Sequence, residues 1–221
     1  MERRVTTSLA ERLKTETRTL HTEAERSPFM GELLHGRMAR GPYVALLRNL
    51  HAIYAAMEPA LVRHAGHAAI APVLLPGLAR TGLLQADLDV IHGGGSWRDT
   101  VELQPATQAY VARLFEVAEG RPALLLAHAY VRYLGDLSGG QLLERIVANS
   151  MQLAPGEGTA FYGFGDAAHT AALKRDFRAG LGQIVLDEPG TDAVVAEAVQ
   201  AFGLHRRLFE ELAAVYLVVP G

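Results

Sequence analysis

The stretch YVRYLGDLSGGQ, residues 130–141, lies inside a long apolar segment whose residue types and periodicity otherwise favour a helix. It contains three glycines, Gly135, Gly139 and Gly140, and a carboxylate, Asp136. Each glycine inside a helix costs about 1 kcal/mol relative to alanine, because glycine loses more conformational freedom on folding. Together the three give up about 3 kcal/mol of local stability. We infer that the chain needs bare backbone at this place.

The composition predicts a globular protein with a large core. The chain has 221 residues, 49% of them hydrophobic, which is enough to bury a core in one domain covering residues 1–221. The formal charge is −3 and the pI is near 6.3. The basic residues are almost all arginines, and they are scattered along the chain. We therefore expect neither a nucleic-acid partner nor an anionic membrane surface.

The absence of cysteine from the sequence excludes several kinds of chemistry. Disulfides, thiolate metal ligands, iron–sulfur clusters and cysteine nucleophiles all require that residue. The first residues, MERRVTTSLAERLKTE, lack the apolar core of a secretory signal, and the last apolar run, LAAVYLVVP, is shorter than the ~20 residues that span a bilayer. We expect a soluble cytoplasmic protein without a membrane anchor.

Hydrophobic periodicity predicts an all-α fold of about eight helices and no convincing strand. Ser8 and Glu11 form a capping-box pattern that begins a first helix of about five turns, ending at Ser27-Pro28. A long helix is expected over 42–66, with a bend at Pro59. Loops are expected at PVLLPG, HGGGSW and APGEG, and the remaining helical stretches are 81–91, 105–119, 122–152, 166–187 and 191–218.

The letters LSGGQ at 137–141 also match the signature motif of ATP-binding-cassette proteins. Such an ATPase additionally needs a G-x-x-x-x-G-K-[ST] loop to hold the nucleotide phosphates. The lysines of this chain are Lys14 and Lys174, and neither follows a glycine. We therefore set the nucleotide-binding interpretation aside.

A di-iron site is a second alternative for a helical protein that contains histidines. It requires a Glu-x-x-His pair from each of two helices. The sequence offers a single pair, Glu32 with His35. His64 and His67 also have ligand spacing, but no carboxylate lies near them in the sequence. Surface histidines are the preferred interpretation of His35, His64 and His67.

The first predicted helix places charged groups along one face. At about 100° per residue from Leu9, Lys14, Arg18, His21 and Glu25 all fall between about 120° and 180°. The simplest interpretation of such a face is a solvated charged flank. That interpretation leaves the glycines of the 130–141 stretch unexplained.

One ligand accounts for both features: a flat, apolar macrocycle with a coordinating metal and two carboxylates. His21 would then be the axial ligand, Glu25 would orient its imidazole, and the two cations of the same face would pair with the carboxylates. Gly135 and Gly139, spaced i and i+4, would present bare backbone to the macrocycle. Haem is the ligand with these properties.

Three stretches resemble the haem oxygenase family: LHTEAERSPFM at 20–30, AHAYVRYLGDLSGGQ at 127–141 and FGLHRRLFEEL at 202–212. The resemblance runs from about Leu9 to Leu212 and is strongest to soluble bacterial members. It implies one all-α domain with haem between a proximal helix and a kinked, glycine-rich distal helix. It also implies conversion of haem to biliverdin, carbon monoxide and ferrous iron, using dioxygen and electrons from a reductase or ferredoxin.

The resemblance assigns the site residues as well. It makes His21 the axial iron ligand and points to biliverdin IXα as the product. The other expected site residues are Glu25 beside the ligand; Gly135, Gly139 and Gly140 on the distal helix; Tyr54, Tyr130, Arg132 and Asp136 in the distal polar network; and Lys14, Arg18, Lys174 and Arg178 at the propionates. Asp136 is expected to organise distal water.

Two positions depart from the family pattern. Arg18 stands where lysine is expected, which keeps the charge but changes its geometry. His205 stands where asparagine is expected, and its effect on the site is open. His51 and His128 lack neighbouring countercharges, so we interpret them as structural. A haem carrier or sensor without turnover, and a helical scaffold without haem, remain the alternative functions.

Overall fold

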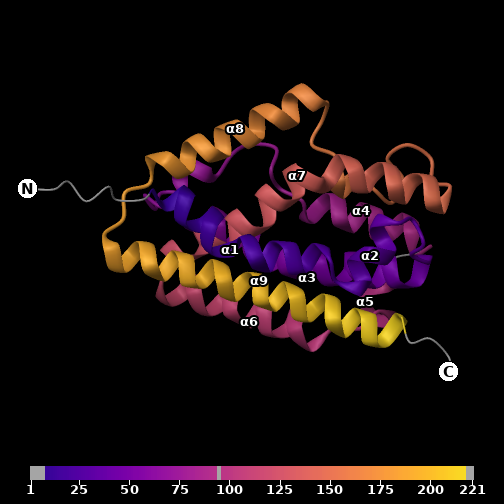
Figure 1. The fold of residues 1–221 in the computed structure, drawn as a ribbon. Coiled ribbons are helices and arrows are strands. Elements are labelled where there is room, and N and C mark those ends of the chain that lie inside the picture. Colours follow the sequence, from indigo (N-terminus) through magenta and orange to yellow (C-terminus); the bar gives the residue numbers. More distant parts are fainter. Residues whose placement is uncertain (1–7, 94–95, 218–221) are drawn as a thin grey trace, which may run out of the picture.

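The computed structural model describes residues 8–93 and 96–217. The regular secondary structure in these two ranges is entirely helical (Figure 1). The α-helices are α1 (Leu9–Glu25), α2 (Pro28–Leu34), α3 (Arg40–Arg63), α4 (Thr81–Ile91), α5 (Trp97–Thr100), α6 (Pro105–Gly120), α7 (Leu125–Met151), α8 (Ala167–Gln183) and α9 (Glu188–Tyr216). Short 3-10 helices are η1 (Ala71–Val73), η2 (Pro122–Leu124) and η3 (Ala160–Tyr162). The predicted all-α fold is confirmed.

The helix starts follow from local side-chain caps. Ser8 Oγ accepts a hydrogen bond from the Glu11 amide at 3.3 Å, and the Glu11 carboxylate accepts one from the Ser8 amide at 3.1 Å, which completes the predicted capping box. Ser27 caps α2 by accepting from the Met30 amide. Asp187 caps α9 through the Gly190 amide at 2.9 Å.

Two departures from the sequence-based expectation concern α5 and α9. Residues 97–100 form the short helix α5, anchored by the buried Trp97, whose Nε1 donates to Asp89 at 2.6 Å. α9 begins at Glu188 rather than at 191, because Pro189 is accepted in the first turn. The predicted long helix runs through Pro59 and ends at Arg63, and the bend expected at Pro59 stays a prediction. The described ranges therefore hold nine α-helices instead of about eight.

α9 is the longest described helix, and several others pack along it. It lies beside α1 and also contacts α2, α6 and α7, as Figure 1 shows for its neighbours α1 and α6. α3 packs against α4 and α6, and its buried side chains include Ile53, Tyr54 and Met57. One hydrophobic cluster of buried residues joins these helices. The core therefore extends across all of these helices.

α7 carries the glycine stretch and changes direction part-way along its length in Figure 1. Its first residues, 125–129, are all buried. Near the glycines, the Ser138 hydroxyl donates to the Leu134 carbonyl at 2.6 Å. A serine bonded to the carbonyl four residues earlier is often found where a helix bends.

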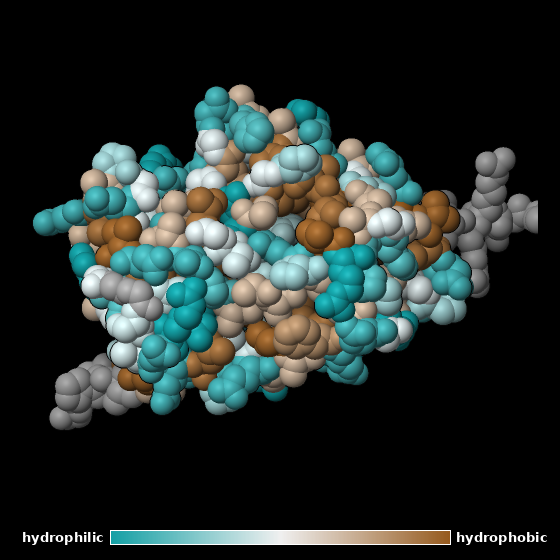
Figure 2. Space-filling view, turned by 180° about the vertical axis from the view of Figure 1, so that it is seen from behind, coloured by the Kyte–Doolittle hydropathy of each residue, from teal (hydrophilic) through white to brown (hydrophobic). Residues whose placement is uncertain are grey.

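The surface gives no sign of a membrane-crossing element in the described part of the chain. None of the helices described there has both the length and the apolar character needed to traverse a bilayer. On the face drawn in Figure 2, hydrophobic residues form separate patches between hydrophilic ones.

A buried ionic network ties α6, α7 and α9 together. The Glu197 carboxylate accepts from Arg113 at 2.6 Å and 2.9 Å, and it lies 3.1 Å from His128 Nε2. Glu197 is 3% exposed and His128 is fully buried. Burial opposes ionisation of Glu197, but Arg113 and His128 outweigh it and lower the pKa of Glu197 to about 2. Burial lowers the pKa of His128, whose neutral ring donates from Nε2.

We predict that Glu197→Gln destabilises the fold by about 3 kcal/mol at neutral pH, because it leaves Arg113 without its buried partner. Since the pKa of Glu197 is below its ordinary value of 4.5, its ionic stabilisation is present above that pH and is lost as the pH falls toward 2. Urea unfolding at neutral pH and at about pH 3 should show the wild-type and variant stabilities converging.

Glu116→Gln is the matched control for that experiment. Glu116 also pairs with Arg113, at 2.8 Å, but its side chain is 70% exposed. An exposed pair contributes about 0–1 kcal/mol, so this variant should stay close to the wild type at both pH values. A loss as large as that of Glu197→Gln would contradict the assigned role of the buried pair.

Candidate functional site

A cleft of about 320 Å³ lies between α1 and α7. His21 and Glu25 line it from α1, and Gly135 and Gly139 line it from α7. The other wall residues are mostly apolar; they are Ala24, Met30, Leu33, Leu34, Leu46, Leu50, Val131, Arg132, Asp136, Ser138, Leu142, Leu143, Phe161, Tyr162, Phe202, His205 and Phe209. The fold thus brings the predicted proximal and distal residues to opposite sides of one cleft.

His21 is the imidazole available to a ligand on the α1 side. Its side chain is 45% exposed, and its Nδ1 lies 3.5 Å from the Glu25 carboxylate one turn later. The edge of Phe202 from α9 packs against the ring at 5.9 Å between centroids. These contacts position the ring and leave Nε2 as its other electron-pair donor.

The three glycines of α7 have two different structural roles. A Cβ built at Gly135 or Gly139 meets no neighbouring atom within 4 Å, whereas one built at Gly140 comes to 2.8 Å from the Tyr162 carbonyl oxygen. Gly135 and Gly139 therefore give the cleft a floor of bare backbone. Gly140 lets η3 pack against α7, and it is not among the residues that line the cleft. Its expected contact with haem stays a prediction.

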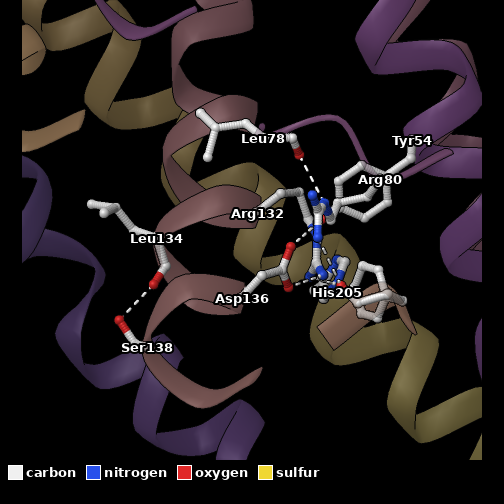
Figure 3. Close-up of polar contacts among 9 residues, drawn as sticks. Tyr54, Leu78, Arg80, Arg132, Leu134, Asp136, Ser138 and His205 are labelled. Atoms are coloured by element: carbon white, nitrogen blue, oxygen red, sulfur yellow. Dashed lines mark hydrogen bonds and ion pairs between the residues drawn. The ribbon is translucent and has the colours of Figure 1, made fainter. Parts of the chain in front are cut away.

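A polar network lies on the α7 side of the cleft (Figure 3). Asp136 accepts from the Tyr54 hydroxyl and from Arg132 Nη2, the latter at 2.8 Å. Arg132 Nε donates to the Tyr54 oxygen at 3.1 Å, and its Nη1 contacts His205 Nε2. Three residues predicted to act together are therefore in direct contact, and His205 joins them from α9.

Burial governs the electrostatics of this network. It raises the pKa of Asp136, while Arg132 and Tyr54 oppose the shift by stabilising the carboxylate. Burial acts to lower the pKa of Arg132, but Asp136 and Tyr54 outweigh it and raise that pKa above its ordinary value. The result is a permanent guanidinium charge beside a carboxyl group that is more basic than an exposed aspartate.

A second hollow of about 230 Å³ adjoins the first at its outer end. The two share His21, Gly135 and Phe202 among their lining residues, so they form one continuous cleft. The outer part is lined by Lys14, Arg18, Tyr130 and Arg178. These are the remaining polar residues predicted for the site, apart from Lys174. An anionic edge of a ligand would meet three cations there.

Lys174 is the exception among the predicted cations. It precedes Arg178 by one turn of α8, but it does not line the outer part of the cleft. Burial, together with the charge of Arg178, lowers the pKa of Lys174. Its expected contact with a propionate stays a prediction.

The residues weighed for a di-iron site have other partners. His35 Nδ1 lies 2.6 Å from the Gly31 carbonyl oxygen, and the Glu32 carboxylate accepts from Arg37 at 2.6 Å. Within residues 8–93 and 96–217, no group of three or more His, Cys, Asp or Glu side chains is placed to hold a metal ion. The geometry of these two residues agrees with the preferred surface interpretation.

Sequence reasoning did not assign Phe202, His205 and Phe209 to the cleft. They project from α9, which packs against α1 along its length. Phe202 and Phe209 are seven residues apart, which places them on one face of a helix. That spacing identifies an apolar face, but the packing of α9 decides that it faces the cleft.

Fold and cleft together define a helical protein with an apolar cleft between a histidine and a glycine-lined helix. The model of the Heme oxygenase family matches residues 7–211. Heme oxygenase 1 of Nostoc sp. is 38% identical over 208 residues, covering 94% of this chain and 87% of the relative. Heme oxygenase 2 of Synechocystis sp. is 40% identical over 210 residues, covering 93% and 83%. The chain belongs to the haem oxygenase family.

Solved structures agree with this assignment. The crystal structure of heme oxygenase-2 from Synechocystis sp. in complex with heme and NO matches with a TM-score of 0.89 at 38% identity, covering 95% of this chain and 86% of that one. Heme oxygenase from Leptospira interrogans matches with a TM-score of 0.87 at 34% identity, covering 93% and 100%. The fold implied by the sequence resemblance is confirmed.

The two neighbouring glycines provide a prediction about stability. Gly140→Ala should destabilise the protein by about 1–3 kcal/mol, because its Cβ would collide with the Tyr162 carbonyl. Gly139→Ala should be neutral or stabilising by up to about 1 kcal/mol, because its Cβ enters open space and alanine favours the helix. Urea unfolding without haem measures both, and the reverse order of stabilities would contradict the assigned roles.

Proposed function

We propose that this chain is a haem oxygenase that opens haem to biliverdin, carbon monoxide and ferrous iron. The observation that supports this proposal is the placement of His21 opposite Gly135 and Gly139 across one apolar cleft, with Asp136 also lining it. When bound, haem is both the substrate and the source of the iron at which dioxygen is reduced. Electrons come from a reductase or ferredoxin, and the protein works in the cytoplasm.

The residues present fit haem in shape and in charge. Apolar side chains from α2, α3, α7 and α9 surround the inner cleft, and an added Cβ at Gly135 or Gly139 would occupy open space. A flat ring can therefore lie against the α7 backbone. Lys14, Arg18 and Arg178 line the outer part, where they can pair with two propionates.

His21 would hold the iron of bound haem through Nε2. Glu25 lies close to Nδ1 and orients the imidazole, as carboxylates commonly do for metal-binding histidines. Both side chains are about half exposed, so their contact contributes little to stability and acts mainly through geometry. Phe202 restricts the ring from the α9 side.

The glycines and the cations would together set how bound haem lies in the cleft. Bare backbone at Gly135 and Gly139 would let α7 come close to the face of the ligand and leave little space beside it. Lys14, Arg18 and Arg178 would hold the propionate edge. We assign biliverdin IXα as the product, in agreement with the family resemblance.

Asp136 acts on protons from the wall of the inner cleft. Tyr54 and Arg132 hold the carboxylate in place, and its remaining lone pairs can accept from water in the cleft. A raised pKa makes this carboxyl group a better proton acceptor than an exposed aspartate near neutral pH. Asp136 thus orders water and holds or passes a proton at its carboxylate oxygens.

The activity itself is tested by adding haemin to the purified protein and then an electron donor. The wild type should give a Soret band that disappears over minutes as biliverdin absorption rises. His21→Ala should lose at least about 99% of this turnover, because the axial ligand is removed, and added imidazole should restore part of it. His35→Ala is the control, since that exposed histidine is bonded to its own helix at Gly31.

Each outcome of the haemin experiment decides between the alternatives. A stable Soret band after reduction would identify a haem carrier or sensor, and no band would indicate a scaffold that does not bind haem. An unchanged ferric spectrum in His21→Ala without imidazole would assign the axial ligand to another residue.

The cations of the outer cleft should control the product more than the affinity. An exposed ion pair contributes about 0–1 kcal/mol, so Arg178→Ala should weaken haem binding by less than about tenfold. Loss of its charge should nevertheless let the ring rotate in the cleft. The products should then be a mixture of biliverdin isomers. Chromatography of the products measures this mixture. Lys174→Ala, which removes a charge outside the lining, should change it less, and a single isomer from Arg178→Ala would count against the assignment.

A further inference from the structure

His205 occupies a defined place on the wall of the inner cleft. It projects from α9, is 4% exposed, and lies with its ring edge-on to Tyr110 at 5.7 Å and to Phe209 at 5.5 Å between centroids. The interplanar angles are 90° and 80°. Packing between two aromatic rings therefore sets the position of the imidazole before any polar contact is considered.

Arg132 divides its donors among three residues on different parts of the fold. Its Nε donates to Tyr54 on α3, its Nη2 to Asp136 on α7 and its Nη1 to His205 on α9 (Figure 3). The guanidinium group is planar, so three contacts along its edges fix both its position and its orientation. Of these three, the contact with His205 is the one that comes from α9.

The contact with Arg132 determines the protonation of His205. Arginine only donates hydrogen bonds, so Nε2 of His205 must carry a lone pair and the ring proton must be on Nδ1. Burial, followed by the charges of Arg132 and His128, lowers the pKa of His205 well below its ordinary value. The ring is neutral and accepts from the guanidinium.

Packing alone does not account for a histidine at this position. Nδ1 of His205 is buried and has no hydrogen-bond partner among the described residues. An unpaired buried N–H group is unfavourable, and a phenylalanine ring would fill the same space without it. The favourable feature of the imidazole is therefore its other nitrogen, which meets Arg132.

We propose that His205 is a positioning residue for the reaction: its neutral ring holds the Arg132 guanidinium in the orientation that presents Asp136 to the cleft. This inference rests on the proposed function. The hydrogen-bond partner of His205 among the described residues is Arg132, and neither Asp136 nor His21 bonds to it. His205 therefore acts through Arg132. An asparagine amide, which the family resemblance leads one to expect here, can also accept from Arg132 and serves as the conservative replacement.

The protonation of His205 is tested on the haem-free protein, independently of any activity. Nitrogen-15 NMR of histidine-labelled wild type, assigned with His205→Asn, should show a neutral ring protonated at Nδ1 across the neutral pH range. Arg132→Met should remove the partner and change the His205 signals. A charged ring at neutral pH, a ring protonated at Nε2, or His205 signals unchanged in Arg132→Met would overturn the proposal.

Two substitutions separate the shape of the ring from its acceptor. His205→Phe keeps a ring and loses the acceptor, and it should slow biliverdin formation about 10- to 100-fold because Asp136 is displaced. Its haem affinity should stay within about twofold of that of the wild type, and its axial-ligand spectrum should be the same, since His21 is untouched. His205→Asn should recover most of the rate. A rate equal to wild type in His205→Phe, or equally slow in both variants, contradicts the proposal.

A double-mutant cycle tests whether His205 acts through Arg132. In the Arg132→Met background, His205→Phe should cause little further loss of rate, because the group that it positions is already absent. Independent, multiplicative losses would overturn the proposal. His51→Phe is the matched control, since His51 also packs edge-on against an aromatic ring, Trp97, and also has an unpaired Nδ1.

The outcome for the proposed function can be separated from that for His205. If wild-type protein makes no biliverdin, the proposed activity fails, and the NMR measurement still decides whether His205 is the neutral acceptor for Arg132. If biliverdin forms and the cycle is additive, the activity stands and the positioning role falls. Circular dichroism melting of each variant keeps folding losses apart from both results.

Discussion

The site depends on one steric constraint: the backbone of α7 must be approachable from the cleft. Any side chain larger than hydrogen at Gly135 or Gly139 would project into the space between α1 and α7. The helix gives up local stability to keep this surface bare. Burial of the residues before and after the glycines, together with the packing of α7 against α9, compensates for that loss.

The charged side chains of the site differ in how far they are exposed to water. Those at the outer end are accessible, and those at the inner end are nearly buried. At the outer end, Lys14, Arg18 and Arg178 line an accessible hollow, where charges attract an anionic edge at little cost in desolvation. At the inner end, Arg132 and Asp136 are nearly buried and satisfy each other. A buried charge without a partner would be strongly destabilising, so the inner pair has to be built as a complete network.

α9 serves the core and the site at once. Glu197 joins it to Arg113 of α6 and His128 of α7, and two turns later His205 meets Arg132. The same helix contributes Phe202 and Phe209 to the wall of the cleft. Anchoring the first half of α9 through a buried ion pair holds the cleft wall in register with α7, which links the stability of the fold to the geometry of the site.

The sequence by itself determined the features that depend on neighbours within a few residues. Helical periodicity, the Ser8–Glu11 capping box and the shared face of His21 and Glu25 are all relations over three or four residues, and the structure contains each of them. Three clustered glycines are enough to indicate bare backbone. The stretches that resemble the family connect the two helices independently of how they pack.

Only the tertiary structure decided relations between residues far apart in the chain. It separated Gly140, which meets Tyr162, from the two glycines that face the cleft, and it left Lys174 outside the lining. It also brought His205 to Arg132 across 73 positions of sequence. Such contacts depend on the angle and register at which helices pack, and these are set by the whole core rather than by any local pattern.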